Sequence, residues 1–155
     1  MTRFLRDIEI FDLLGLSLDD KKKDEYMAKM FLPTLTQAIK RGIEESNLSE
    51  DKLDYILEMI DNKTDVEILQ VESLKLMPNL LNIIEEEAYM FKKGALLDQL
   101  NDIEKDIGDR KADDTSYFLN VISDLRKHLQ DEDEEGLKNS WTLYNDQRKK
   151  FIKVD

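Results

Sequence analysis

The sequence has very few of the residues that carry thiol, imidazole or phosphate-binding chemistry. Its 155 residues include no cysteine, one histidine, two prolines and five glycines. The lack of cysteine excludes disulfide bonds and thiolate metal sites, and nothing marks an oxidising compartment. The glycines are too scattered along the chain to form a phosphate-binding loop. We therefore predict no catalytic, cofactor-binding or metal-binding residues.

Long apolar runs are also missing. No uncharged run approaches the roughly 20 residues that a membrane-spanning helix needs, so we predict no membrane segment. In residues 1–14 the acidic side chains interrupt the apolar positions, which is not the pattern of a secretory signal peptide. Together with the lack of cysteine, this predicts a cytoplasmic protein.

Charge is unbalanced toward acid. The chain has 35 acidic and 23 basic residues and a net charge of −12, with −7 up to Gly94 and −5 after it. The basic clusters are short, at residues 21–23 and 148–153, and have acids close by. Because nucleic-acid binding needs many cations to neutralise phosphates, we predict no direct nucleic-acid binding. An acidic surface suits a basic protein partner instead.

Apolar residues at helical spacing are abundant from one end of the chain to the other. A first helix is expected to place its apolar face over residues 4–14 and to end at Gly15, a residue that suits a left-handed cap. Pro33 interrupts the next apolar stripe and predicts a kink or a break near residues 29–33. A long helix is expected over residues 78–107, with a break at Gly94 as the alternative.

Several helix starts carry capping signals. Ser17 or Asp19 suits the N-terminus of the second helix, and Ser49 followed by two acids suits another. Residues 64–67 match a capping box that begins at Thr64. Ser49 also begins a Ser-x-x-Lys motif, but the other motifs of the penicillin-binding enzymes are missing, so we interpret it as a cap.

These elements predict an all-α fold of six or seven amphipathic helices in a compact bundle, with a C-terminal helical hairpin. We expect an N-terminal helical domain over residues 1–107 and the hairpin over residues 114–155, packed on that domain. The boundary is placed at the polar segment 108–114.

Three segments of the first 94 residues carry a family resemblance. They are Leu13-Leu14-Gly15-Leu16, Leu48-Ser49-Glu50-Asp51, and Met77-Pro78-Asn79-Leu80 leading into three glutamates. With them, residues 1–94 resemble a small helical domain of unknown function found mainly in ultrasmall candidate-phylum bacteria. The resemblance implies an all-α, cytoplasmic bacterial protein and supplies no catalytic residues.

Two acidic segments were weighed as metal sites and interpreted otherwise. Residues 131–136 begin like a calcium loop, but Thr142 stands where the loop needs a carboxylate, so an acidic helix start is expected. The glutamates at 85–87 lack the Glu-x-x-His pairs of di-iron bundles and predict a solvated helix face. A shared proton or ion pair between Asp124 and His128, one helical turn apart, was weighed as well, but the interpretation we favour is that His128 borders the seam of Leu125 and Leu129.

The C-terminal stripe offers the best candidates for partner binding. Trp141, Tyr144, Arg148 and Phe151 fall on one helical face, and aromatic residues with arginine dominate interface energetics. The interpretation we favour is that they pack in the core against Phe118, Val121 and Leu125. The methionines at 27, 30, 59, 77 and 90 are likewise interpreted mainly as adaptable core residues.

Together these observations favour a non-enzymatic protein–protein interaction module, acting as a scaffold, adaptor or regulatory subunit. Its partner is an unidentified protein, and Trp141, Tyr144 and Arg148 are the alternative docking residues. Two other functions stay open: an acidic decoy of a basic nucleic-acid-binding protein, and a metal-independent enzyme that uses Asp, Glu, Lys or Tyr.

Overall fold

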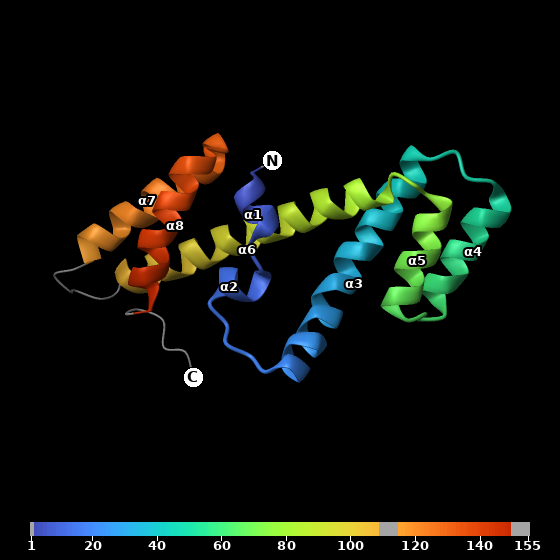
Figure 1. The fold of residues 1–155 in the computed structure, drawn as a ribbon, viewed down its shortest axis with the longest axis horizontal. Helices are drawn as coiled ribbons and strands as arrows, with labels where there is room; N and C mark the ends of the chain where they lie inside the picture. The colour runs from blue at the N-terminus through green and yellow to red at the C-terminus, as the bar shows by residue number, and fades with distance from the viewer. Residues whose placement is uncertain (1, 109–114, 150–155) are drawn as a thin grey trace. The chain divides into compact units, whose positions relative to one another are not determined.

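Amphipathic helices joined by short turns make up the computed structural model of the chain (Figure 1), which describes residues 2–108 and 115–149. Within these residues there are eight helices and no strand, so the predicted all-α fold is confirmed. The helices are α1 (Arg3–Asp7), α2 (Ile10–Leu14), α3 (Asp20–Glu45), α4 (Glu50–Asp61), α5 (Val66–Leu76), α6 (Leu80–Gly108), α7 (Thr115–Asp131) and α8 (Glu134–Arg148). No described helix is both long enough and apolar enough to cross a membrane.

Contacts divide the chain into two compact units. Unit 1 comprises Met1–Ser17 and Lys92–Asp155, and unit 2 comprises Leu18–Phe91. The packing thus groups α1 and α2 with the C-terminal hairpin, whereas the sequence placed them with the other N-terminal helices. Apart from Gly108, the domain boundary expected over residues 108–114 lies outside the described residues.

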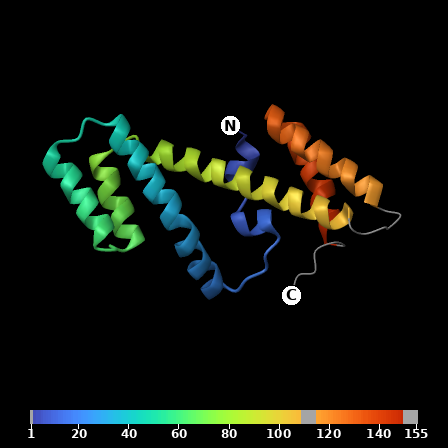
Figure 2. The ribbon, with the colours of Figure 1, turned by 180° about the vertical axis from the view of Figure 1, so that it is seen from behind.

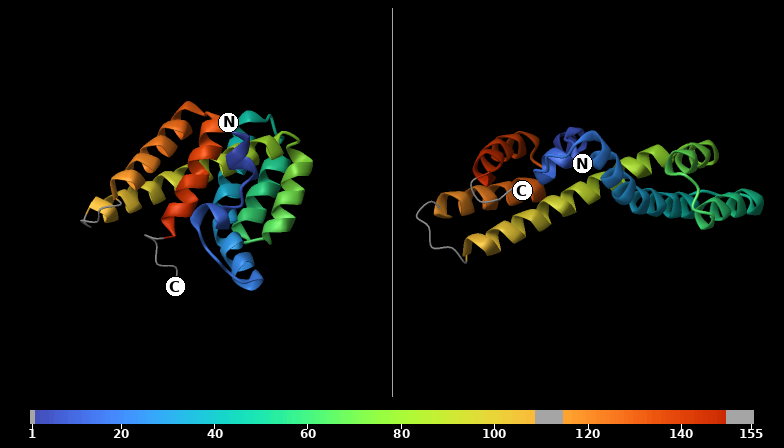
Figure 3. Two further views of the ribbon diagram at one scale, coloured as in Figure 1. Left: turned by 60° about the vertical axis from the view of Figure 1, so that its left-hand side comes forward. Right: turned by 90° about the horizontal axis from the view of Figure 1, so that it is seen from below.

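Unit 1 is built on the predicted C-terminal hairpin, in which α7 and α8 pack side by side (Figure 3). Each apolar face buries residues three and four apart, as amphipathic helices require. The buried side chains come from every helix of the unit and include Leu5, Leu13, Leu96, Leu100, Ile103, Phe118, Ile122, Leu125, Leu137 and Tyr144.

Unit 2 has its own core, formed where α4 and α5 lie side by side and α3 packs on α5 (Figures 1 and 2). Its buried members are Leu35, Ala38, Ile39, Ile56, Met59, Leu69, Met77, Leu80, Ile83 and Ile84. The four buried residues of α3 all lie in the C-terminal half of that helix, at Leu35, Ala38, Ile39 and Gly42.

The helix caps follow the sequence closely. Gly15 ends α2 in the left-handed region with φ of 70°, a conformation that glycine adopts without strain. Asp19 caps α3 by accepting a hydrogen bond from the Lys22 amide at 2.8 Å, and Ser49 caps α4. The predicted cap at Thr64 is wrong by one residue, because Asp65 caps α5 and accepts from the Glu67 amide.

The helix expected over residues 4–14 differs from the prediction, whereas the expected continuous helix through Gly94 is confirmed. The single helix expected over residues 4–14 is two short helices, because the chain is extended at Ile8 and Glu9. The Lys92 ammonium stabilises this interruption by donating to the carbonyls of Arg6 at 3.1 Å and Ile8 at 2.7 Å. Helix α6 runs through Gly94, as expected.

Pro33 does not break α3. The helix is continuous from Asp20 to Glu45, because proline removes only one backbone donor and the neighbouring turns hold. Two threonine hydroxyls add hydrogen bonds there, from Thr34 to the Met30 carbonyl and from Thr36 to the Leu32 carbonyl.

Candidate functional site

The predicted docking residues of the C-terminal stripe lie in the core of unit 1. Tyr144 is fully buried, Arg148 is 5% exposed and Trp141 is 9% exposed. The Tyr144 ring stacks nearly parallel on Phe118 with centroids 5.8 Å apart, and the Trp141 ring lies 5.9 Å from Phe4. The burial favours the core interpretation. Phe151 lies outside the described residues.

Arg148 holds a buried polar network that the sequence did not indicate. Its guanidinium donates to the carbonyls of Asp12 at 2.6 Å and Leu13 at 2.8 Å, and to the Gln99 side chain. Gln99 also donates to the Leu14 carbonyl, and the Tyr144 hydroxyl donates to Gln99 at 2.6 Å. The last carbonyls of a helix have no intrahelical donors, so these side chains satisfy the end of α2.

Burial shifts the ionisation of this network. Desolvation lowers the pKa of Arg148, an effect opposed by the charges of Tyr144 and Asp12. Desolvation also raises the pKa of the Tyr144 hydroxyl, against the nearby Arg148. The network is therefore a structural device that links α2, α6 and α8 within unit 1.

The acidic segment before α8 is a helix start, as expected. Asp133 caps the helix by accepting from the Gly136 amide at 3.1 Å. The acid next to His128 is Asp133 and not Asp124, the partner weighed from the sequence: the His128 Nδ1 lies 3.3 Å from an oxygen of Asp133. Since His128 ends α7, the turn that follows brings the capping carboxylate to the imidazole. No group of three metal-binding side chains occurs among the described residues.

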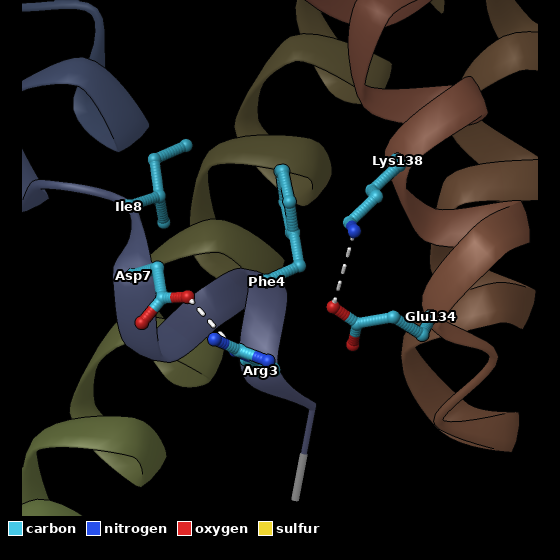
Figure 4. Close-up of a pocket in the computed structure, with 6 residues that line it drawn as sticks. All are labelled: Arg3, Phe4, Asp7, Ile8, Glu134 and Lys138. Carbon is cyan, nitrogen blue, oxygen red and sulfur yellow. Dashed lines mark ion pairs between the residues drawn. The ribbon is translucent and has the colours of Figure 1, made fainter.

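A shallow hollow of about 430 Å³ lies between α1 and α8 in unit 1 (Figure 4). Phe4 and Ile8 supply its apolar surface. Its charged members form two ion pairs, Arg3 with Asp7 at 3.5 Å and Lys138 with Glu134 at 3.8 Å. The side chains of both basic residues are more than half exposed. Exposed pairs of this kind are weak, and the hollow holds no converging polar groups that single out a ligand.

In unit 2 the apolar stripe of α3 is only half covered. From Asp20 to Thr34, a segment that we call the α3 arm, no residue is buried, whereas Leu35, Ala38 and Ile39 are in the core. Met27 is 39% exposed and Leu32 is 42% exposed. Figures 1 and 2 show this half of α3 pointing away from α4 and α5. The arm thus presents large apolar side chains that unit 2 does not bury.

A groove of about 590 Å³ lies beside the arm, between α3 and α6. Its lining residues include Lys29, Met30 and Pro33 from α3, and Glu87, Met90 and Phe91 from α6. Met90 is 50% exposed and Phe91 is 40% exposed. We call this hollow the α3–α6 groove. Apolar side chains of both helices line it, and it joins the apolar face of the arm.

An arginine clamp fixes one end of the groove. Arg41 of α3 donates to Glu87 at 2.8 Å and to Glu86 at 2.9 Å, both on α6. These hydrogen bonds, that to Glu87 first, raise the pKa of Arg41. The glutamates at 86 and 87, expected on a solvated face, thus hold the two walls of the groove together.

The methionines divide between core and groove. Met59 and Met77 are buried, as expected for core residues, but Met27 and Met90 are exposed. The prediction of a core role is therefore wrong for Met27 and Met90. Their helical spacing is the same in either case, and what differs is whether another helix of the fold covers them.

Ionisable groups with shifted pKa values do not gather in either hollow. Arg41, Lys92, Tyr144 and Arg148 all have shifted pKa values, with burial lowering that of Lys92 against the charges of Asp7 and Glu9. None of the four lines the α3–α6 groove or the hollow of Figure 4.

Comparison of the chain with family models, with curated proteins and with solved structures finds no match. The resemblance of residues 1–94 to a bacterial helical domain stays a prediction.

Proposed function

We propose that the protein is a non-enzymatic protein–protein interaction module that binds its partner through the α3–α6 groove and the α3 arm. One observation carries the proposal: the apolar stripe of α3 continues for about two turns, from Tyr26 to Pro33, beyond the core that buries residues of its C-terminal half. A helix face of this kind is covered in most soluble proteins. An uncovered one beside an apolar groove is typical of a binding surface.

The groove has the features of helix recognition. Amphipathic helices dock by placing an apolar face in a hydrophobic groove between two helices, with residues at i, i+3 and i+4 as anchors. Met30 and Met90 on opposite walls are flexible side chains that adapt to the shape of a partner. The ion pairs of Arg41 hold the spacing of the walls, so the groove is formed before a partner arrives.

The energies indicate weak to moderate affinity. Complete burial of a large apolar side chain contributes roughly 1.5–3 kcal/mol, and the exposed residues Met27, Leu32, Met90 and Phe91 are already about half buried. Each therefore has roughly 1 kcal/mol still to gain on binding. Because association itself costs at least about 4 kcal/mol, a partner must add further contacts around the groove.

The groove is tested by comparing two matched double variants in affinity capture from cells. Met30→Ser with Met90→Ser alters both walls of the groove, whereas Leu57→Ser with Val71→Ser alters exposed apolar residues on α4 and α5. We expect the groove variant to recover at least tenfold less of a partner protein that the wild-type chain and the control both capture. Circular dichroism must show the same helix content for all three. Equal recovery by the groove variant would contradict the proposal.

Salt separates this function from that of an acidic decoy. Salt screens the attraction between exposed charges that lie farther apart than the Debye length. This length falls from roughly 30 Å at 0.01 M salt to about 10 Å at 0.1 M. The chain has a net charge of −12, so a decoy would release a basic partner steeply over that range. For a partner held by the apolar groove, we expect recovery to change less than twofold over the same range, from about 0.01 to about 0.1 M salt, whereas steep release would favour the decoy.

A further inference from the structure

The α3 arm differs from the rest of unit 2 in charge. Unit 2 has seventeen acidic and nine basic residues, a net charge of −8. Residues 19–34, which comprise the arm and its capping residue Asp19, have four of each and a net charge of zero. Two copies of an acidic protein repel each other, so an apolar face that is locally neutral is where that repulsion is least.

The charges that border the groove are of opposite sign on its two walls. Lys29 lies on the α3 wall, and Glu87 lies on the α6 wall with Glu86 beside it. Glu86 is 51% exposed even while it pairs with Arg41. A helix that enters the groove with a basic residue next to α6 therefore meets acidic side chains there. The α3 arm is itself such a helix, because it combines Lys29 with an exposed apolar face.

We propose that the α3–α6 groove of one copy receives the α3 arm of a second copy. A two-fold axis pairs the two arms antiparallel and brings Lys29 of each copy toward Glu86 of the other, so one arrangement covers both arms and both grooves. The inference names an occupant for the groove of the proposed function and rests on that groove being a binding surface.

The size of the face sets the strength of the dimer. The fifteen residues of the arm span roughly 22 Å at 1.5 Å per residue. A single helix face of this length is small beside a standard interface, which buries about 800 Å² on each partner. Small interfaces of this kind are weak and depend on concentration. The expected state is a monomer–dimer equilibrium in the micromolar range, in which a tighter partner displaces the second copy.

Sedimentation velocity of the full chain between about 5 and 500 µM tests the inference. We expect the weight-average mass of the wild type to rise from that of one copy toward that of two. For Met30→Ser with Met90→Ser, the protein concentration at which half of the chains are dimeric should be at least tenfold higher. The control, Leu57→Ser with Val71→Ser, should associate like the wild type. A thermal melt of each variant shows that the fold is intact.

Lys29→Glu provides a second variant that leaves the apolar face unchanged. It places an acidic residue opposite Glu86, so we expect weaker association at 0.05 M salt that recovers in part at 0.5 M salt. A monomer throughout the range, or association that the groove variant does not change, overturns the second-copy inference. That result leaves the proposed function intact if captured protein still depends on Met30 and Met90. Self-association without groove-dependent capture overturns the proposed function instead.

Discussion

Replacing Trp141 with alanine is expected to lower the free energy of unfolding by about 3–5 kcal/mol, the usual cost of truncating a buried large aromatic residue. The indole is 9% exposed and contacts three partners: the Phe4 ring at 5.9 Å, the Tyr144 ring at 5.7 Å, and the Arg148 guanidinium, 5.0 Å from the ring centroid. Its removal leaves a cavity between α1 and α8 that these neighbours cannot fill without moving. Urea denaturation followed by circular dichroism measures the loss.

Tyr117→Ala is the matched control, because Tyr117 is an aromatic residue of the same unit that is 52% exposed. Its cost is expected to be within about 0.5 kcal/mol. Trp141 is the one tryptophan of the chain, so its fluorescence also reports its environment, and blue-shifted emission is expected. Emission typical of a solvent-exposed tryptophan, together with equally small losses of unfolding free energy for the two variants, would show that Trp141 is a surface residue and a candidate for docking.

Arg148→Met is expected to cost about 2–4 kcal/mol, because it leaves buried carbonyl acceptors without their donors, at roughly 1–3 kcal/mol each. In the variant the Asp12 carbonyl still accepts a hydrogen bond from the Gly15 amide at 3.2 Å. The larger part of the lost free energy therefore comes from the Leu13 carbonyl. Methionine retains much of the apolar volume, which separates the hydrogen bonds from the packing. Arg148→Lys should lose an intermediate amount, since the single nitrogen of lysine cannot reproduce the planar fork with which two guanidinium nitrogens reach Asp12, Leu13 and Gln99.

Arg126→Met serves as the control for this network. Arg126 pairs with Glu104 at 2.8 Å and with Asn101, but its side chain is 29% exposed. Partly exposed pairs contribute about 0–1 kcal/mol, so a small loss is expected. If Arg148→Met and Arg126→Met prove equal in urea denaturation, the buried network contributes no more than a surface pair, and its assigned role in fixing α2 is wrong.

The fold could be predicted where local chemistry decides it. The left-handed cap at Gly15, the side-chain caps at Asp19 and Ser49, and the continuous α6 all depend on residues within one or two turns. The interruption between α1 and α2 could not be predicted, because it depends on Lys92, more than 80 residues away. A distant donor can satisfy carbonyls that the local pattern assigns to a helix.

The candidate site was harder to predict for the same reason. Periodicity shows which face of α3 is apolar, but whether Met27 and Met30 are covered depends on where the neighbouring helices end. The sequence therefore could not separate them from Met59, which has the same helical spacing and is buried. The Arg148 network likewise joins residues 135 and 136 positions apart, a distance over which sequence pattern carries no signal.

Methionine oxidation measures whether the arm and groove of unit 2 are exposed while the core of the unit is closed. The rate of methionine sulfoxide formation increases with exposure of the side chain, and the buried methionines of unit 2 serve as internal controls. At about 1 µM protein, below the range in which we expect a dimer, mild peroxide followed by peptide mass spectrometry should oxidise Met27 and Met90, 39% and 50% exposed, well before Met59 and Met77, 7% and 1% exposed. Oxidation of Met27 and Met90 as slow as that of Met77 would show that the arm and the groove are covered and are not a binding surface.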